Sequence, residues 1–182
     1  VILKTASVII NTKSPLASVF DDVIIGKQAI LPEVDGIVYE DRLGTTGWIY
    51  RKKILVGTRD LLIHHGVPVL KEDFEKKYTR KGRKVLYLAE AGKLMAMFVV
   101  SYSADPQLKK ALRKLEKSGM TILVRSADPF INDESIAELF ELPDGYIRVM
   151  NSSNGRAFEK YSNLFAQKSP AYIVHNGSAL GL

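Results

Sequence analysis

The sequence predicts an α/β protein in which an antiparallel α+β part is followed by a portion of a doubly wound parallel sheet. In the first half, short β-branched runs are separated by tight turns, which is typical of antiparallel strands. From Asp105 onward, apolar runs alternate with amphipathic helical patterns, which indicates right-handed crossovers between parallel strands. We expect residues 1–92 to form one domain and residues 93–182 the other.

The composition is that of an ordinary globular protein of 182 residues, with 46% hydrophobic and 25% charged residues. The absence of cysteine excludes disulfides and thiolate chemistry and fits a reducing compartment. The longest apolar run, Leu94–Val100, is far shorter than the roughly 20 residues that span a bilayer. Since the chain begins at Val1 without a basic and apolar leader, we expect no signal peptide and a piece excised from a longer protein.

The elements of the first half follow from local signals. Ser14 and Pro15 predict the start of a helix that stops at Gly26. Thr58 is suited to cap a second helix, which Gly66 ends. Val1–Ile10 fits a helix or a strand. The other expected elements are strands at Gly36–Tyr39, Gly47–Arg51 and Lys53–Thr58, helices at Arg59–His65 and Lys71–Lys81, and a hairpin of Lys84–Ala89 with Leu94–Ser101.

The second half begins with a capped helix. Asp105 suits the N-cap and Pro106 the first helical position. The helix ends at Gly119, where a positive φ is needed, and a buried strand at Thr121–Val124 follows. The remaining predictions are an apolar stripe at Leu108, Ala111, Leu112 and Leu115, helices at Asn132–Phe140 and Arg156–Phe165, and strands at Tyr146–Met150 and Ala171–Val174.

Polar residues follow the strand that ends at Val124. Ser126 and Asp128 stand at its carboxyl end, where open α/β sheets place ligands. They could bind a phosphate, or they could cap the next helix by accepting backbone N–H bonds.

Several short motifs share the order and spacing of one protein family. Ala6-Ser-Val-Ile-Ile-Asn-Thr-Lys-Ser-Pro-Leu-Ala17 is in register with Ala-Ser-x-Glu-x-x-Ser-Glu-His-Pro-Leu-Ala, and Arg42-Leu-Gly-Thr-Thr-Gly47 with Gly-x-Gly-Val-x-Gly. Lys53–Thr58 corresponds to a strand ending in Val-Gly-Asn. Ser126-Ala-Asp128 corresponds to Thr-Gly-Asp, and Val174-His-Asn-Gly177 to Val-Gly-Asp-Gly. With these motifs the chain resembles the cytosolic ATP-binding and phosphorylation region of P-type cation-transporting ATPases, closest to the heavy-metal branch.

The resemblance implies a nucleotide-binding-like domain followed by part of a haloacid-dehalogenase-like phosphorylation domain. It implies weak or absent binding of ATP and Mg²⁺, a membrane-embedded remainder of the parent protein, and a location at the cytoplasmic face of a membrane. We expect no bound metal ion held by a dedicated site and no nucleic-acid partner. The implied nucleotide contacts are Ser14, Pro15, Gly44, Gly47 and Gly57, and the implied phosphate-loop residues are Ser126, Asp128, Asn176 and Gly177.

The chain departs from the family pattern at the nucleotide contacts. Ser14 replaces the histidine that binds adenine, and Ile9 and Lys13 replace its two acidic neighbours. Arg42 replaces the first glycine of the nucleotide turn, where a Cβ hinders close approach of backbone to a ligand.

The departures extend to the phosphorylation chemistry. Asn176 replaces the carboxylate that helps to hold Mg²⁺, and no Asp-Lys-Thr-Gly-Thr occurs anywhere in the chain. The segment Val1–Ser7 matches that motif weakly, and in this match Leu3 takes the position of the phosphorylated aspartate. Leucine has no nucleophilic oxygen. The resemblance therefore implies a catalytically silent fragment that binds nucleotide weakly at most. An active cation-transporting ATPase whose phosphorylated aspartate lies outside this chain, and a non-enzymatic basic interaction module, are the alternatives.

Several residues that could suggest a binding site also have a structural explanation. Gly44, Gly47 and Gly57 could serve hairpin turns instead of a nucleotide. His64 and His65 diverge by about 100° on a helix, so they do not share one metal ion easily. The net charge of +6 is concentrated in Lys71–Lys84 and on a second helix, which we interpret as a solvated polar face.

Overall fold

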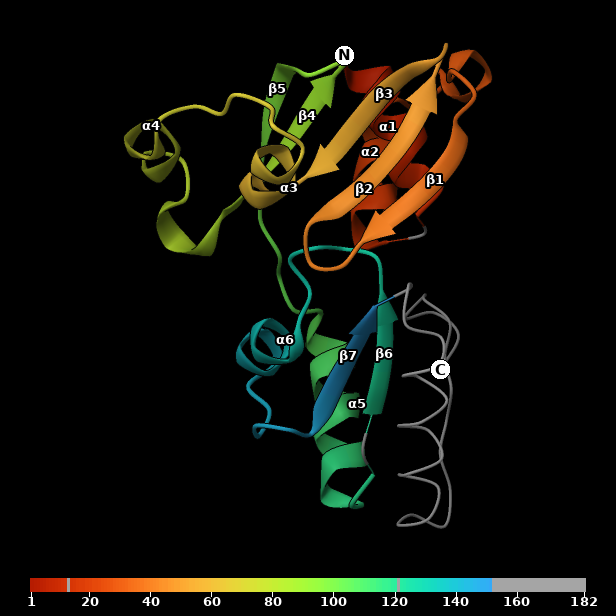
Figure 1. Ribbon diagram of the computed structural model, residues 1–182. Coiled ribbons are helices and arrows are strands. Elements are labelled where there is room, and N and C mark those ends of the chain that lie inside the picture. Colours follow the sequence, from red (N-terminus) through yellow and green to blue (C-terminus); the bar gives the residue numbers. More distant parts are fainter. Residues whose placement is uncertain (13, 121, 152–182) are drawn as a thin grey trace. The chain divides into compact units, whose positions relative to one another are not determined.

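The computed structural model describes residues 1–12, 14–120 and 122–151 (Figure 1). Its chain divides into two compact units. The first contains Val1–Ser101 together with Ala127–Pro129, and the second contains Tyr102–Ser126 and the described residues from Phe130 onward. The expected boundary between residues 92 and 93 falls within a hairpin of the first unit, because the strand that begins at Lys93 pairs along its length with the strand before it.

The first unit is built on a five-stranded antiparallel sheet in the order β1-β2-β3-β4-β5. Successive strands are neighbours, so each hairpin adds one strand to the sheet. The register pairs Gly44 with Gly57, Leu55 with Ala89, and Leu86 with Phe98. The strands are β1 (Asp35–Glu40), β2 (Gly44–Ile49), β3 (Lys52–Gly57), β4 (Lys84–Glu90) and β5 (Lys93–Val100).

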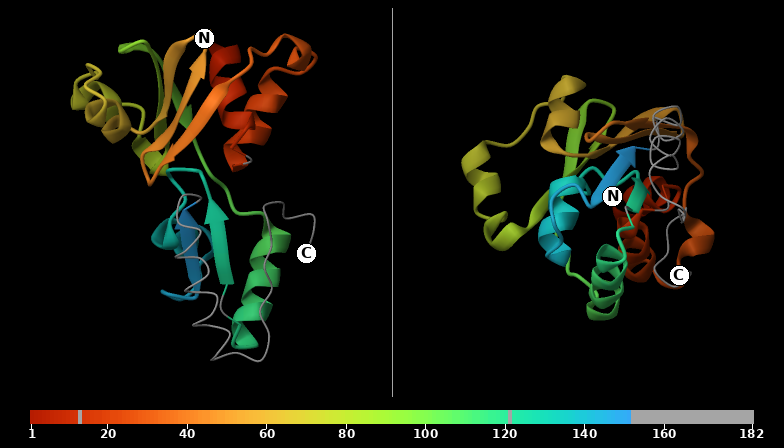
Figure 2. Two further views of the ribbon diagram at one scale, coloured as in Figure 1. Left: turned by 45° about the vertical axis from the view of Figure 1, so that its right-hand side comes forward. Right: turned by 90° about the horizontal axis from the view of Figure 1, so that it is seen from below.

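Two helices, α1 (Ile2–Ile10) and α2 (Pro15–Val23), cover one face of this sheet (Figures 1 and 2). The apolar N-terminal stretch is thus a helix. Its Lys4 ammonium lies 2.6 Å from a Glu90 carboxylate oxygen at the end of β4, and this partly buried ion pair fixes α1 to the sheet. On α2, the Phe20 ring packs edge-on against Phe98 of β5, with ring centroids 5.3 Å apart.

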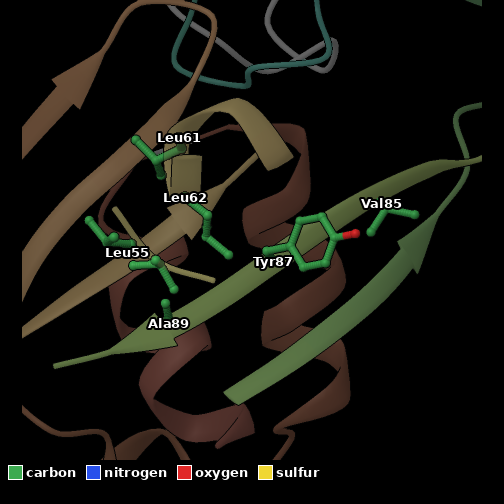
Figure 3. Close-up of a cluster of buried hydrophobic side chains, with 7 residues drawn as sticks. Leu55, Leu61, Leu62, Val85, Tyr87 and Ala89 are labelled. Atoms are coloured by element: carbon green, nitrogen blue, oxygen red, sulfur yellow. The ribbon is translucent and has the colours of Figure 1, made fainter. Parts of the chain in front are cut away.

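The other face is covered by α3 (Arg59–His64) and the segment that follows it. The Thr58 hydroxyl accepts a hydrogen bond from the Leu61 N–H, which confirms the predicted cap. Alternate residues of β3 and β4 point to this side, where they pack on α3 (Figure 3). The buried cluster consists of Leu55, Leu61, Leu62, Val67, Val85, Tyr87 and Ala89.

The charged helix predicted at Lys71–Lys81 is shorter in the structure, where α4 spans only Glu72–Lys76 and a single 3-10 turn, η2, occupies Arg80–Gly82. Continuing the helix would place cations four residues apart on one face, and such like-charge pairs are destabilising. Lys81 also has a φ of 61°, in the left-handed region, so the helix cannot run through it.

A polar network fixes α4 to the sheet. Glu75 on α4 accepts hydrogen bonds from the Arg59 guanidinium at 2.8 Å and from the Tyr87 hydroxyl at 2.7 Å. Arg59 also donates to the Leu70 carbonyl oxygen at 2.6 Å. Burial raises the pKa of Tyr87 to about 12, and the hydrogen bond to Glu75 acts in the same direction. One carboxylate thereby satisfies the polar atoms of two side chains under α4.

The second unit contains a parallel strand pair, β6 (Ile122–Ser126) and β7 (Ile147–Asn151), with α5 (Pro106–Lys117) and α6 (Asp133–Phe140). Parallel pairing confirms the change to an α/β pattern after Asp105. The Asp105 carboxylate accepts from two backbone N–H groups of α5, as expected for an N-cap. Gly119 follows the helix with a φ of 72°, also as expected. The buried core is Leu112, Ile136, Leu142 and Ile147.

Ala111 is exposed on α5, so the predicted apolar stripe is narrower than expected. The helix predicted at Arg156–Phe165 and the strand predicted at Ala171–Val174 lie outside the described residues. Within the described part of the chain, no helix is long and apolar enough to cross a membrane.

Candidate functional site

The glycines expected to contact a nucleotide include a directly opposed pair. Gly44 begins β2 and Gly57 ends β3, and the two residues face each other across the strands. A Cβ built on Gly57 would lie 2.2 Å from the Leu43 carbonyl oxygen and 2.9 Å from the Gly44 Cα. A Cβ built on Gly44 would lie 2.4 Å from the Val56 carbonyl oxygen. The sheet itself therefore requires glycine at both positions.

The reading of these glycines as hairpin-turn residues is wrong. Gly44, Gly47 and Gly57 lie within strands, and the turn between β2 and β3 is formed by Tyr50 and Arg51, with φ of 50° and 61°. Those left-handed values suit a tight antiparallel hairpin, where glycine or asparagine is the common choice. The sequence has no glycine at this turn, so the turn gave no local signal.

Gly47 lies under the helices of the opposite face. A Cβ there would approach the Val34 side chain to 2.8 Å and the Val8 side chain to 3.7 Å. Val8 belongs to α1, so Gly47 allows that helix and the segment before β1 to pack closely on β2. The space that a side chain would fill is occupied by protein.

Arg42 stands in the turn between β1 and β2 with a φ of 56°. The Leu43 N–H donates to the Glu40 carbonyl oxygen at 3.0 Å, which closes the turn. A non-glycine residue in the left-handed region costs roughly 1–2 kcal/mol. The backbone has the conformation that favours glycine, but the residue is arginine.

Ser14 and Pro15 begin α2, as predicted. Ser14 is the N-cap residue, with an extended φ of −82° and ψ of 165°, and Pro15 takes the first helical position. Ser14 is buried, and its side chain makes no capping bond to α2. Its backbone N–H donates to the Thr12 hydroxyl at 3.3 Å. Ile9, at the position of the first glutamate in the Ala-Ser-x-Glu motif that the chain resembles, is also buried.

A polar cluster that the sequence analysis missed joins β1, β2, β3 and the end of α3. Glu40 accepts from the Thr46 hydroxyl at 2.6 Å, and its carboxylate oxygens lie 2.7 and 2.9 Å from His65 Nε2. Lys53 Nζ lies 2.9 Å from His65 Nδ1. An ammonium can only donate, so the hydrogen-bond pattern assigns the imidazole proton to Nε2 and makes Nδ1 the acceptor.

The cluster uses His65 as a bridge between a cation and a carboxylate, which is a structural role. Its neighbour His64 contacts it through ring edges, with centroids 5.2 Å apart. Among the described residues, no three histidines or carboxylates gather in a way that could hold a metal ion.

We expect the Glu40 cluster to make the first unit sensitive to acid. Burial of Glu40 raises the pKa of its carboxyl, but hydrogen bonds from Thr46 and His65 outweigh burial, so the pKa lies below the ordinary value of 4.5. A lowered folded-state pKa gives stability that is present above the unfolded-state pKa and is lost as the pH falls through the folded value. Glu40→Gln should lower the free energy of unfolding by about 1 kcal/mol at neutral pH. The variant should also lose less of this free energy than the unmodified chain when the pH is lowered.

The measurement is urea unfolding followed by Trp48 fluorescence at a series of pH values from neutral to below 4.5. Asp22→Asn, an exposed carboxylate on α2, is the matched control for the change in charge. If both variants show the same pH dependence, Glu40 is not the source of the acid sensitivity.

Of the four predicted phosphate-loop residues, the structure describes Ser126 and Asp128. Ser126 is the last residue of β6, and Asp128 is buried with 4% of its surface exposed. Neither caps α6: the N-cap is Asn132, whose side chain accepts from the Ser135 N–H, while the Ser135 hydroxyl accepts from the Asn132 N–H. The capping interpretation of Ser126 and Asp128 is therefore wrong for this helix, and the phosphate interpretation stays a prediction.

Asn176 and Gly177, the other two phosphate-loop residues, lie outside the described residues. The structure thus brings Gly44 and Gly57 together, and it places Ser14 and Pro15 at the start of a helix that packs on the same sheet.

No model of a known protein family matches the chain. No curated protein matches it in sequence either.

Solved structures are similar to it at low identity. The N-domain of HMA6, a copper-transporting P-type ATPase, is 18% identical, with 54% of this chain and 83% of that chain covered and a TM-score of 0.45. The catalytic domain of the CPx-ATPase CopB-B is 18% identical, with 92% and 56% covered and a TM-score of 0.48. A zinc-transporting PIB-type ATPase is 13% identical, with 97% and 28% covered and a TM-score of 0.46.

Proposed function

We propose that this chain is the cytosolic ATP-binding-type region of a membrane protein that resembles heavy-metal P-type ATPases, and that it binds nucleotide only weakly and transfers no phosphoryl group. The observation that carries the proposal is the turn at Arg42. Its backbone has a left-handed φ of 56°, which favours glycine, at the position where the family motif has its first glycine. The turn therefore has a backbone suited to glycine, while the Cβ and long side chain of arginine hinder close approach of a ligand.

The surroundings of the other motif residues support weak binding. Ile9 is buried where the motif has a carboxylate, and Ser14 offers a hydroxyl where the motif has an imidazole. Leu61, from α3, packs over the Gly44–Gly57 pair, since its Cδ2 would lie 2.6 Å from a Cβ on Gly57. The motif positions that remain glycine are thus explained by packing within the sheet.

Loss of phosphoryl transfer rests on the residues themselves. Such transfer needs a nucleophile, a metal clamp and positioned cations acting together. The chain has no Asp-Lys-Thr-Gly-Thr motif. In the weak match to it at the N-terminus, the position of the aspartate is occupied by Leu3, on α1. A leucine side chain cannot form an acyl phosphate.

Calorimetric titration of ATP into the chain, with and without Mg²⁺, tests the proposal. We expect a Kd weaker than about 1 mM for the unmodified chain. The double variant Arg42→Gly/Ser14→His should bind at least about ten-fold more tightly, a gain of about 1.4 kcal/mol. Micromolar binding by the unmodified chain would contradict the proposal and favour an active ATPase whose phosphorylated aspartate lies elsewhere.

Arg51→Gly is the matched control for Arg42→Gly. Both arginines have left-handed φ values, 61° and 56°, but Arg51 lies in the β2–β3 turn. Each change relieves roughly 1–2 kcal/mol of strain and adds about 0.4–1 kcal/mol of unfolded-state freedom, so both should stabilise the fold slightly. If Arg51→Gly raises the affinity for ATP as much as Arg42→Gly, the β1–β2 turn is not the nucleotide turn.

A further inference from the structure

The segment after α4 is the most basic stretch of the chain. Residues 76–84 read Lys-Lys-Tyr-Thr-Arg-Lys-Gly-Arg-Lys, so six of nine residues are cationic and none is acidic. We call residues 76–84 the basic loop. All six cationic side chains are exposed: Lys76, Lys77, Arg80, Lys81, Arg83 and Lys84. Such a density of one sign of charge creates a local potential that attracts anions.

Two aromatic rings accompany the basic loop. Phe74 and Tyr78 are 41% and 38% exposed, although both are large side chains. Their ring centroids lie 5.2 Å apart, with an interplanar angle of 53°. Together they form an exposed aromatic pair beside the cations.

Nearby acids do little to neutralise the loop. Among the described residues, the ion pairs of this segment involve Lys76, whose ammonium lies 3.9 Å from Glu72 and 3.6 Å from Asp73. Glu75 points inward to Arg59. The remaining five cations of the loop are therefore available to an anionic partner.

The segment projects from the first unit and is held there firmly. Within that unit, α4 and the loop after it stand out from the sheet on the side of α3 (Figures 1 and 2). The hydrogen bonds of Glu75 to Arg59 and Tyr87 fix the base of this projection. A convex, anchored projection can meet a flat surface without rearrangement of the fold.

We propose that the basic loop and the aromatic pair form a docking surface for a bilayer that contains anionic phospholipids. Lysine and arginine near such a surface each strengthen binding roughly five-fold. Aromatic rings with an apolar body and a polar edge, such as tyrosine, favour the headgroup region. This surface does not depend on the proposed nucleotide role, because it rests on other residues.

A single-stranded nucleic acid fits the surface less well. Proteins that bind single strands combine a charged groove with successive aromatic platforms on which bases stack. Here Phe74 and Tyr78 lean on one another at 53° and form one cluster, and the cations lie on a projection. Charge complementarity and shape both favour the lipid surface.

The test is co-sedimentation of the whole 182-residue chain with phosphatidylcholine vesicles, with and without phosphatidylserine. We expect binding to the anionic vesicles only, with an affinity that falls as salt screens the charges. The variant Lys77→Gln/Arg80→Gln/Lys81→Gln should lower the partition coefficient about 100-fold, because three surface cations are lost. Phe74→Ala/Tyr78→Ala should weaken the binding that persists at high salt.

The chain offers a matched control on α5. Lys110→Gln/Lys114→Gln/Lys117→Gln removes the same charge from three exposed side chains outside the basic loop. We expect it to change the partition coefficient less than about five-fold, since those cations lie outside the docking surface. Thermal unfolding of every variant checks that the fold is kept.

Three outcomes overturn the proposal. Equal binding to neutral and anionic vesicles would show that charge does not drive the binding. An equal decrease of the partition coefficient in the basic-loop variant and in the α5 variant would show that the basic loop is not the docking surface. A single-stranded oligonucleotide that competes with the vesicles, and whose binding depends on Phe74 and Tyr78, assigns the surface to nucleic acid instead.

Discussion

Gly57→Ala is expected to lower the free energy of unfolding of the first unit by about 3 kcal/mol or more, near the upper limit for added volume in a packed site. The new methyl would lie 2.2 Å from the Leu43 carbonyl oxygen and 2.9 Å from the Gly44 Cα, and both are backbone atoms. They cannot withdraw without opening the β2–β3 ladder and the 2.8 Å hydrogen bond from the Thr58 N–H to Leu43. Trp48, the one tryptophan, lies in β2, so its fluorescence during urea unfolding reports on this unit.

Gly66→Ala separates the steric cost from the conformational cost. Gly66 has a φ of 67° and no atom within 4 Å of a built Cβ, so alanine there should cost only about 1 kcal/mol. Leu61→Ala should not rescue Gly57→Ala, because the backbone contacts persist when the Leu61 side chain is removed. A Gly57→Ala chain as stable as the Gly66→Ala chain would show that the glycine pair is not tightly apposed.

The elements that could be predicted from the sequence are those fixed by a few adjacent residues. Asp105 followed by Pro106 determines a helix start, Thr58 caps α3, and Gly119 takes the positive φ after α5. Each signal acts within one turn of backbone, where hydrogen bonding and steric exclusion suffice to decide the conformation. The change from antiparallel to parallel pairing was predictable because it follows from the alternation of longer patterns.

The features that could not be predicted depend on residues brought together by the sheet. His65 meets Glu40 and Lys53, which are 25 and 12 residues away in the chain. The polar cluster gives no local signal, since its members stand on different strands and at a helix end.

The same limit applies to the glycines of the candidate site. The spacing of Gly44 and Gly57 suggested turns or a nucleotide, whereas their tight apposition follows from the register of β2 on β3. Sequence resemblance located the motif positions, but only the strand pairing shows which of them the fold needs for its own packing. Arg42 is informative for the opposite reason: its left-handed φ of 56° favours glycine, yet the residue is arginine.

Glu75→Ala is expected to destabilise the first unit by about 2–4 kcal/mol, because it leaves two donors without their shared acceptor. Arg59 Nη1 donates to Glu75 at 2.8 Å, and the fully buried Tyr87 hydroxyl donates to it at 2.7 Å. Urea unfolding followed by Trp48 fluorescence measures the change. Glu72→Ala on the same helix is the control: its partner Lys76 is mostly exposed, so the cost should stay below about 0.5 kcal/mol.

Tyr87→Phe tests the same network at alkaline pH. Burial, together with the hydrogen bond to Glu75, raises the pKa of Tyr87 from 10.0 to about 12. Since the folded value is the higher one, the stability contributed by this hydroxyl is present below pH 10.0 and is lost as the pH rises to about 12. The difference in unfolding free energy between the unmodified chain and Tyr87→Phe should therefore narrow over that interval, and other titrating groups cancel in the comparison. A difference that stays constant up to pH 12 would place the Tyr87 hydroxyl in water rather than against Glu75, and would remove the anchor of α4.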